Sequence, residues 1–496
     1  MNTKTFTLKQ IKKTTDLAEK CIIVVSETRA KNANTWSVFE LKTSERIEKA
    51  LKRREEPLKT GDLLSIPGVE KTDADLFLAV LPEEMTTFNL LGFAGAALKQ
   101  GLPASAKSLS LVFLEAKEEA RLSDCFGAAI ATRIFQMPVY GKRVEKLKPF
   151  KLKDVFIFSA ANQQKNFNYG FETGEGENLV RYLGALPPNE LNTITYGAKI
   201  KELATKYKFQ LKFYSHAELK KMGAGAFTAV DQGNPDSKGG IYELTYSPSK
   251  AKNKNAIAFV GKGLCFDTGG YDVKTQGYMI GMKADMTGSA LALSNMMTAA
   301  RLKWPLKMKA FLGVTENHIS PKAYKADEVV IALNGMSIEV INTDAEGRMV
   351  LADTLTLASR AKPEMIIDYA TLTGSATIAI GTSYSAGFTN REELHSRIIK
   401  SGKISGERVW PFPLDKDFGK TLESPIADMI QCAPKRSPDH ILAAYFLSQF
   451  VDKDIPWVHI DLSSAEHTGG LAHVESALTG FGVRWTMEFL KASFKI

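Results

Sequence analysis

The chain has 496 residues, which is long enough for two or three domains that each bury a hydrophobic core. With 44% hydrophobic, 24% charged and 9% aromatic residues, the composition excludes a wholly disordered chain. The formal net charge of +9 is concentrated in residues 1–170, which hold 27 Lys and Arg against 20 Asp and Glu. This excess could bind nucleic acid or an acidic partner, but scattered solvated lysines explain it as well, and we favour the second interpretation.

Cysteine spacing and the N-terminal residues indicate the compartment. The four cysteines form no CxxC pair, which argues against a disulfide framework and suits a reducing compartment: Cys21, Cys125, Cys265 and Cys432. The sequence MNTKTFTLKQIKKTT lacks the apolar core of a signal peptide. Nowhere do about 18 apolar residues run together, as a membrane-spanning helix requires. We therefore expect a cytoplasmic protein with no membrane-spanning helix.

The N-terminal part alternates short apolar β-rich runs with helical stretches, which is typical of α/β architecture. Strands are predicted at residues 22–26, 76–81, 109–114 and 155–159, with helices near 88–99 and 117–135. Residues 162–177 are rich in Asn, Gln, Gly and Glu without an apolar period, so they are the best candidate for a linker. We therefore expect an N-terminal α/β domain at 1–165 and a larger domain at 166–496.

The same alternation continues through the larger domain. A helix near residues 178–185 ends at Pro187-Pro188. Strands are then predicted at 209–214, 241–246, 256–260, 309–314, 338–342, 365–369 and 457–461, with helices near 288–301, 349–360 and 440–450. No internal repeat or low-complexity tract is present, so an α/β fold with two domains is the simplest interpretation.

Two segments that follow predicted strands are unusually rich in charge and glycine. Sites in open α/β sheets form where strands end and loops converge. The first segment, VGKGLCFDTGG at residues 260–270, continues through Lys274 to Asp285, and the second is NTDAEGR at 342–348. Each segment alone is explained at least as well by a turn or by acidic helix capping. Gly-Lys-Gly also lacks the GxxxxGK[ST] spacing of a phosphate-binding loop.

Considered together, the two segments supply a set of four carboxylates: Asp267, Asp285, Asp344 and Glu346. Such oxygen ligands could bridge two divalent ions, and they suit Mg, Mn or Zn without choosing among them. A two-metal site polarises a carbonyl and lowers the pKa of a shared water, which yields a nucleophile at neutral pH. Lys274 and Arg348 would then be cations available to stabilise an oxyanion.

Other hydrolytic machinery is absent from the sequence. There is no GxSxG elbow and no HExxH motif, and the seven histidines are too scattered for a His-based zinc site. Ser463-Ser464 near His467 would suit a serine hydrolase, but no triad follows from spacing alone. We favour a hydrogen-bonded or surface histidine there.

The NTDAEGR segment resembles the signature of the leucyl aminopeptidase family. The first segment agrees independently, because its spacing matches the family's pattern of lysine, aspartate, catalytic lysine and aspartate at Lys262, Asp267, Lys274 and Asp285. Further similarity lies in ATLTG at 370–374, IADM at 426–429 and TGFGV at 479–483. The resemblance covers roughly residues 175–490, whereas residues 1–165 agree only in position and α/β character.

The resemblance implies an enzyme that releases N-terminal, preferentially apolar and leucine-like amino acids from peptides by two-metal activation of water. It implies two divalent ions per subunit, Mn or Zn, and a homo-hexamer. An N-terminal α/β domain would join a larger catalytic α/β domain with a central mixed β-sheet. One ion would be held by Asp267, Asp344 and Glu346, and the second by Lys262, Asp267, Asp285 and Glu346. Lys262 can act as a ligand only when deprotonated, and burial beside divalent cations would lower its pKa.

The resemblance also assigns the catalytic and substrate-binding residues. Lys274 would polarise the substrate carbonyl and stabilise the tetrahedral intermediate, and Arg348 would hold a bicarbonate that acts as general base. Motif alignment places the pocket for the N-terminal side chain at Met282, Thr371 and Gly374. Methionine offers a flexible apolar wall, and glycine leaves room for a bulky side chain.

The sequence departs from the family pattern at Asp272, two residues before Lys274, where a small residue is usual. Asp272 could lie close enough to raise the pKa of Lys274. Residues 287–289 and 432–440 differ as well, which puts the pH optimum and substrate preference in doubt but not the reaction class.

Two alternatives to the aminopeptidase function remain. A nucleic-acid-binding regulator, a role of some bacterial family members, has support only from the basic N-terminal part, and an inactive structural protein is disfavoured because no ligand or catalytic position is lost.

Overall fold

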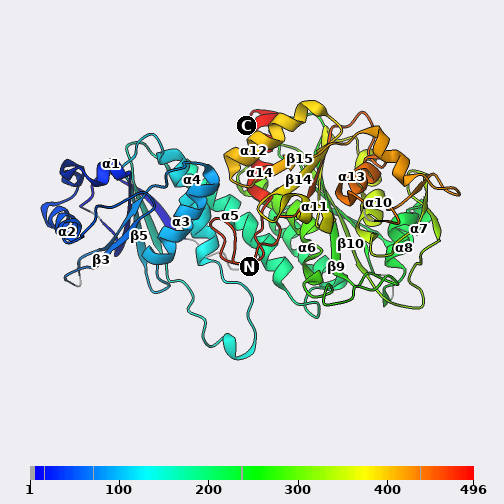
Figure 1. Ribbon diagram of the computed structural model, residues 1–496, viewed down its shortest axis with the longest axis horizontal. Coiled ribbons are helices and arrows are strands. Elements are labelled where there is room, and N and C mark those ends of the chain that lie inside the picture. The colour runs from blue at the N-terminus through cyan, green and yellow to red at the C-terminus, as the bar shows by residue number, and fades with distance from the viewer. Residues whose placement is uncertain (1–5, 16, 71, 236–237, 436) are drawn as a thin grey trace. The chain divides into compact units, whose positions relative to one another are not determined.

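The computed structural model describes residues 6–15, 17–70, 72–235, 238–435 and 437–496 (Figure 1). The chain divides into two compact units. The N-terminal unit comprises Met1–Asn178 and Thr468–Ala477, and the C-terminal unit comprises Leu179–His467 and Leu478–Ile496. The N-terminal unit therefore extends past residue 165 and includes a second, short segment of chain. None of the described helices is long and apolar enough to cross a membrane.

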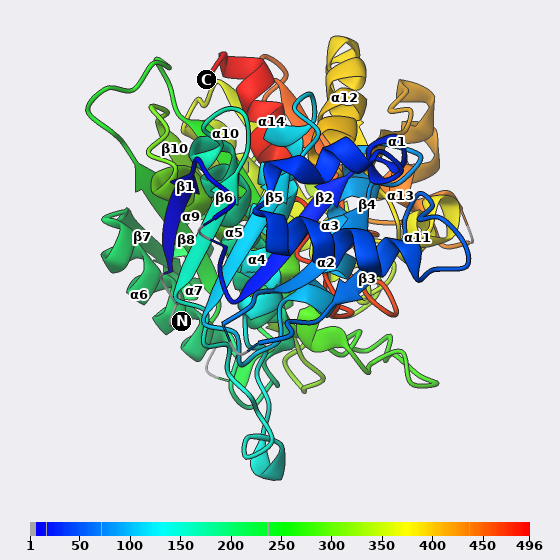
Figure 2. The ribbon, with the colours of Figure 1, turned by 90° about the vertical axis from the view of Figure 1, so that its left-hand side faces the viewer.

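The N-terminal unit is built on a six-stranded sheet, whose strands lie side by side in Figure 2. Their order is β1 (Thr7–Ile11), β6 (Asp154–Phe158), β5 (Ser108–Phe113), β2 (Lys20–Val25), β4 (Asp75–Val80) and β3 (Leu63–Ile66). All neighbours pair in parallel except β3, which is antiparallel to β4. The helices of this unit are α1 (Glu27–Ala30), α2 (Leu41–Lys52), α3 (Thr87–Gly101), α4 (Glu119–Ile134) and most of α5 (Gln164–Ala185).

Helices cover both faces of this sheet because its central strand is apolar on both sides. In β2, Ile22 and Val24 pack in one cluster with residues of α3 and α4, whereas Ile23 and Val25 pack in another with Trp36. Alternation of this kind follows from the two-residue period of a strand. The four strands and two helices predicted here are present, with ends displaced by no more than two residues.

The linker predicted at residues 162–177 is wrong, because α5 runs as one helix of 22 residues. Its glycines serve close packing between helices. A Cβ at Gly170 would lie 1.9 Å from the carbonyl oxygen of Asp124, and one at Gly174 would lie 2.8 Å from that of Ala128, both in α4. Glycines that look like a flexible segment in the sequence therefore allow α5 to approach α4.

The C-terminal unit is built on an eight-stranded mixed sheet. The strands follow the order β15 (Val409–Pro411), β14 (Ser385–Thr389), β17 (Trp457–Asp461), β13 (Met365–Ala370), β9 (Ile257–Asp267), β10 (Met308–Asn317), β8 (Gly240–Tyr246) and β7 (Gln210–Ser215). The four strands β17, β13, β9 and β10 pair in parallel, whereas β14 with β17 and β8 with both neighbours pair antiparallel. A small second sheet contains β11 (Val329–Ile331), β12 (Ser337–Glu339) and β16 (Met429–Ile430).

Helices α9 and α10 pack against β9, and the segments that precede them, residues 268–286 and 340–345, contain some of the charged residues singled out in the sequence. The helices are α6 (Thr193–Tyr207), α7 (His216–Met222), α8 (Gly225–Asp231), α9 (Thr287–Arg301), α10 (Glu346–Arg360), α11 (Gly374–Ile380), α12 (His395–Ser405), α13 (Asp439–Ser448) and α14 (Val483–Phe494). Ala258, Val260 and Leu264 of β9 share a buried cluster with α8, α10 and α13, whereas Gly261 and Gly263 face Ser289 of α9. The predicted strand 338–342 is shorter than expected, since β12 ends at Glu339.

Candidate functional site

Three carboxylates meet where β9 ends and α10 begins. Asp267 is the last residue of β9, Glu346 is the first of α10, and Asp344 lies in the loop just before that helix. One oxygen from each lies within 4.8 Å of the other two. Asp267 is held in place by Asn317, whose side-chain amide donates to it over 2.9 Å. The two segments singled out in the sequence are therefore brought together by the fold.

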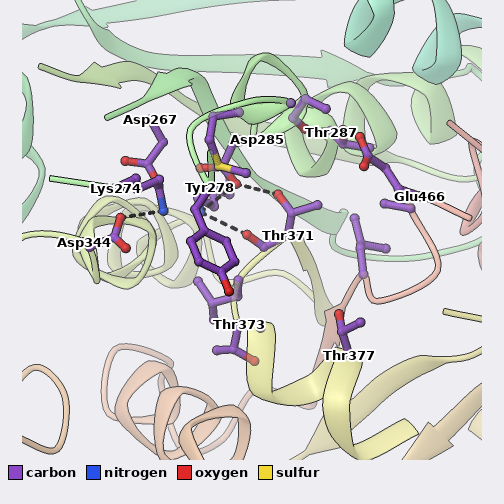
Figure 3. Close-up of a pocket in the computed structure, with 18 of the residues that line it drawn as sticks. Asp267, Lys274, Tyr278, Asp285, Thr287, Asp344, Thr371, Thr373, Thr377 and Glu466 are labelled. Carbon is purple, nitrogen blue, oxygen red and sulfur yellow. Dashed lines mark hydrogen bonds and ion pairs between the residues drawn. The ribbon is translucent and has the colours of Figure 1, made fainter. Parts of the chain in front are cut away.

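Two lysines neutralise part of this negative charge, and Figure 3 shows one of them, Lys274, beside Asp267 and Asp344. Lys274 Nζ lies 2.9 Å from Asp267 Oδ2 and 2.5 Å from Asp344 Oδ1. Lys262 Nζ lies 2.9 Å from Asp285 Oδ1 and 3.1 Å from Glu346 Oε1. It also donates to the carbonyl oxygen of Thr371 over 3.0 Å. Four carboxylates thus share two ammonium groups.

Burial perturbs the pKa values of this cluster. Burial, followed by the charge of Asp267, raises the pKa of Glu346 to about 8. Burial likewise raises the pKa of Asp285 to about 6, although Lys262 opposes the shift. Burial would lower the pKa of Lys262, but the charges of Asp285, Glu346 and Asp267 outweigh it and raise this pKa. Without a bound cation Lys262 is therefore an ammonium ion, whereas the neutral amine expected of a ligand requires competing positive charge.

The donor set fits divalent cations. Asp285 Oδ2 and Glu346 Oε2 are buried and have no hydrogen-bond partner among the described residues. An unpaired buried carboxylate oxygen is costly, and native structures seldom leave one without a ligand or water. Carboxylate oxygens are ligands that Mg, Mn and Zn accept.

Gly347 allows Lys262 to reach the cluster. A Cβ at position 347 would lie 2.6 Å from Lys262 Cε and 2.7 Å from its Nζ. The amino group of Lys262 can therefore pass beside the first turn of α10 only because the residue after Glu346 has no side chain. This explains the glycine of the NTDAEGR segment.

Asp272 is hydrogen-bonded to Thr343, whereas the ion pairs of Lys274 are with Asp267 and Asp344. Asp272 Oδ2 accepts a hydrogen bond from the backbone amide of Thr343 over 2.7 Å, and the backbone amide of Asp272 donates to the Thr343 hydroxyl over 2.8 Å. The Thr343 hydroxyl in turn donates to the carbonyl oxygen of Gly269 over 2.6 Å. Asp272 and Thr343 therefore join the loop after β9 to the loop before α10, while Asp267 and Asp344 hold Lys274.

Arg348 is buried behind the cluster and does not line the cavity. Its Nη2 lies 2.7 Å from Asp439 Oδ2, and its Nη1 donates to the carbonyl oxygen of Gln431 over 2.9 Å. Its Nε has no partner among the described residues. The guanidinium therefore keeps a buried donor without a hydrogen-bond partner among the described residues.

A cavity of about 650 Å³ opens beside the cluster. All the predicted site residues except Arg348 line it, including the predicted pocket residues Met282, Thr371 and Gly374. The Thr371 hydroxyl donates to Asp285 Oδ1 over 2.7 Å, which joins the pocket to the charged cluster. A Cβ at Gly374 would meet no atom within 4 Å, so the cavity is open at this point.

Sequence reasoning missed Asp461 and Glu466, which also line this cavity. Asp461 Oδ1 accepts from the Leu372 amide over 3.0 Å and thereby fixes the loop after β13. Its place at the end of the predicted strand 457–461 is the signal that could have found it. The hydrogen-bonded His467 is confirmed, since its Nδ1 lies 2.8 Å from the Thr382 hydroxyl.

Comparison with known sequences agrees with the sequence motifs. Residues 178–487 match the model of the cytosol aminopeptidase family, catalytic domain. A probable cytosol aminopeptidase from Aquifex aeolicus is 38% identical over 347 residues, which cover 69% of this chain and 69% of that protein. Another from Corynebacterium diphtheriae is 31% identical over 440 residues, which cover 87% of this chain and 85% of that protein.

Solved structures extend the likeness to nearly the whole chain. The cytosol aminopeptidase from Coxiella burnetii is 26% identical with a TM-score of 0.80, over 98% of this chain and 99% of that chain. The bottromycin maturation enzyme BotP in complex with Mn is 27% identical with a TM-score of 0.81, over 96% of this chain and 99% of that chain. The expected α/β fold with a central mixed sheet is confirmed. The chain belongs to the cytosol aminopeptidase family, and it is a metallopeptidase.

Proposed function

We propose that this protein removes N-terminal amino acids from peptides with two divalent cations held at the carboxylate cluster. The observation that carries the proposal is the excess of acceptors in the cavity, where four carboxylates share two ammonium groups. Two of their buried oxygens have no hydrogen-bond partner among the described residues. Manganese is present in the BotP structure, which supports Mn for this chain, with Zn as the alternative.

The family resemblance assigns the cluster residues to two overlapping sets of ligands. Asp267, Asp344 and Glu346 would hold one cation, and Lys262, Asp267, Asp285 and Glu346 would hold the other. Lys262 would bind as a neutral amine after losing its proton. The bound cations would polarise the scissile carbonyl and lower the pKa of the attacking water.

Lys274 is the group of this chain placed to stabilise negative charge on the substrate. Its ammonium is fixed by Asp267 and Asp344 at the side of the cavity, and their charges raise its pKa although burial opposes them. Lys274 would therefore remain charged and donate a hydrogen bond to the carbonyl oxygen as that oxygen becomes an oxyanion. The unpartnered Nε of Arg348 supports a role in holding bicarbonate, with Asp439 sharing the guanidinium.

Met282, Thr371 and Gly374 would receive the side chain of the N-terminal residue. Met282 supplies an adaptable apolar wall, and the open space at Gly374 accommodates bulk. The surrounding carboxylates would repel an acidic side chain, so leucine and methionine should be preferred to aspartate and glutamate. Met282→Ala should change the ranking of apolar residues by about 1–3 kcal/mol in kcat/KM.

The wider organisation of the enzyme is also proposed from its family. The C-terminal unit would form the catalytic domain, which the sequence places at residues 166–496, after an N-terminal α/β domain that the sequence places at 1–165 and the fold extends to Asn178. The protein would act on peptides in the cytoplasm as a homo-hexamer. Its relatives carry the name cytosol aminopeptidase, which supports this location.

Metal removal and restoration test the proposal. Chelation and gel filtration should abolish hydrolysis of leucine p-nitroanilide, and Mn, Co or Zn added singly should restore it. Circular dichroism before and after chelation shows whether the protein stays folded when the metal is removed, so that a loss of activity is not confused with unfolding. Full activity in exhaustively chelated protein that contains no metal by mass spectrometry would overturn the two-metal proposal.

A further inference from the structure

Glu466 is a carboxylate of the cavity that takes no part in the charged cluster. In Figure 3 Lys274 and Asp344 lie on one side of the view and Glu466 on the other, with Thr371 between them. Among the described residues, no hydrogen bond or ion pair engages the Glu466 carboxylate. Partial burial raises the pKa of Glu466 and the charge of Lys283 opposes this shift, but the Lys283 ammonium donates its hydrogen bond to the carbonyl oxygen of Ala185 over 2.8 Å. An anionic group of the cavity is thus left for a ligand.

A second polar group lines the same cavity without a partner. Ser463 is 7% exposed, and its hydroxyl is buried with no hydrogen-bond partner among the described residues. A buried hydroxyl without a partner costs free energy, so a ligand that bonds to it gains affinity. Thr377 adds an exposed hydroxyl to the lining. These groups favour a polar tip on whatever side chain enters the cavity.

The remaining lining provides apolar surface for the stem of such a side chain. Met282, Leu462 and Ala465 all line the cavity, and Ala465 directly precedes Glu466 in the chain. Lysine and arginine have this pattern, because their methylene stems pack against apolar surface while the cation lies in a polar environment. A neutral leucine fills the apolar part alone and leaves Glu466 and Ser463 unused.

We propose that Glu466 is a specificity-determining residue that makes peptides with N-terminal lysine or arginine good substrates, in addition to those with leucine or methionine. This inference rests on the proposed aminopeptidase function. Glu466 pairs with the cation of the substrate side chain, and Ser463 accepts a hydrogen bond from it. Because Glu466 is exposed at the cavity in the free enzyme, the pair is screened by salt and its effect is moderate.

The test compares lysine with norleucine, which has the same stem without the ammonium group. Aminoacyl-methylcoumarin substrates of Lys, norleucine, Leu and Glu are assayed with the Mn-reconstituted full chain. We expect Glu466→Gln to lower kcat/KM for Lys by about fivefold to tenfold. The values for norleucine and Leu should stay within about twofold. Glu466→Lys should lower kcat/KM for the Lys substrate further and raise kcat/KM for the Glu substrate. Glu423→Gln, an exposed carboxylate of the same unit that does not line the cavity, should change none of these values.

A measurement on the unmodified protein complements the variants. Raising NaCl from about 50 to 500 mM should reduce the ratio of kcat/KM for Lys to that for norleucine. An unchanged ratio in both Glu466→Gln and high salt, with leucine hydrolysis intact, overturns the role of Glu466 but leaves the aminopeptidase function standing. Failure of the Mn-loaded wild type to cleave leucine or norleucine overturns the proposed function and this inference with it.

Discussion

The central strands of the two sheets, β2 and β9, each pair in parallel with a neighbouring strand on both sides, but their side chains are very different. In β2 the residues from Cys21 to Val25 are all apolar and fully buried. In β9 the buried residues include Lys262, 3% exposed, and Asp267, 2% exposed. Strand β2 contributes only apolar side chains to the core, whereas β9 also places charged side chains in the interior.

The difference shows which residues the fold does not need. Burying a charge costs several kcal/mol unless it is paired and hydrogen-bonded. The N-terminal unit forms a comparable sheet with an apolar central strand, so Lys262 and Asp267 are not required for an α/β sheet. Their cost is visible in the raised pKa values of Glu346 and Asp285. Groups that weaken a core and converge on a cavity are expected where chemistry takes place.

The largest effect on activity is expected for Glu346→Gln. The substitution nearly preserves volume but removes a carboxylate that would touch both cations, so kcat/KM should fall by roughly 10³ or more. The free energy of unfolding of the metal-free protein should fall by less than about 1 kcal/mol, because the anion lost is one that burial disfavours. Activity assays and urea denaturation measure the two quantities. A variant with normal activity and normal metal content would refute the ligand assignment.

Lys274→Ala should lower kcat by about 10²–10³, the usual effect of losing one oxyanion stabiliser, while the metals stay bound. Lys322→Ala is the matched control, since Lys322 is exposed and does not line the cavity. Single-turnover kinetics and metal analysis separate loss of chemistry from loss of cations. Equal rates in Lys274→Ala and the control would contradict the assignment.

Asp272→Asn should reduce kcat/KM by about tenfold, because it weakens the contact with Thr343 that joins the two ligand-bearing loops. The alkaline limb of the pH–rate profile should keep its position, since the Asp272 carboxylate binds Thr343 and not Lys274. A shift of that limb would contradict this prediction and show that the Asp272 carboxylate raises the pKa of Lys274.

The smallest effect on activity is expected in the N-terminal unit. Leu111 of β5 is fully buried in its core, so Leu111→Ala should lower the free energy of unfolding by about 2–5 kcal/mol. The kcat per folded molecule should remain unchanged. Urea denaturation and active-site titration provide the measurements, and a proportional loss of kcat would erase the contrast between the two units.

The fold was predictable where a strand contains a continuous apolar run, as in β2 and β4, because burial on both faces of a sheet favours such a run. The short edge strands β1 and β15 were missed, since such strands carry little pattern. Helix α5 was taken for a linker because its glycines signal flexibility in a sequence, whereas the packing against α4 that explains them cannot be seen there.

The candidate site was predictable as far as motifs carry it. Lys262, Asp267 and Glu346 lie in segments whose spacing is distinctive, and the fold brings those segments together. Asp461 and Glu466 reach the same cavity from a segment more distant in the chain and outside those motifs. Which residues converge from such distances is decided by strand order, and a single sequence does not reveal it.

Metal stoichiometry tests the central claim most directly. Protein stripped of metal, reloaded with Mn and dialysed is analysed by mass spectrometry for bound Mn per chain, together with Asp285→Asn and Leu111→Ala. The account predicts two Mn per chain in the wild type and in Leu111→Ala, and about one in Asp285→Asn, because Asp285 is a ligand of only one proposed site. Two tightly bound Mn ions in Asp285→Asn, or none in the wild type, would contradict it.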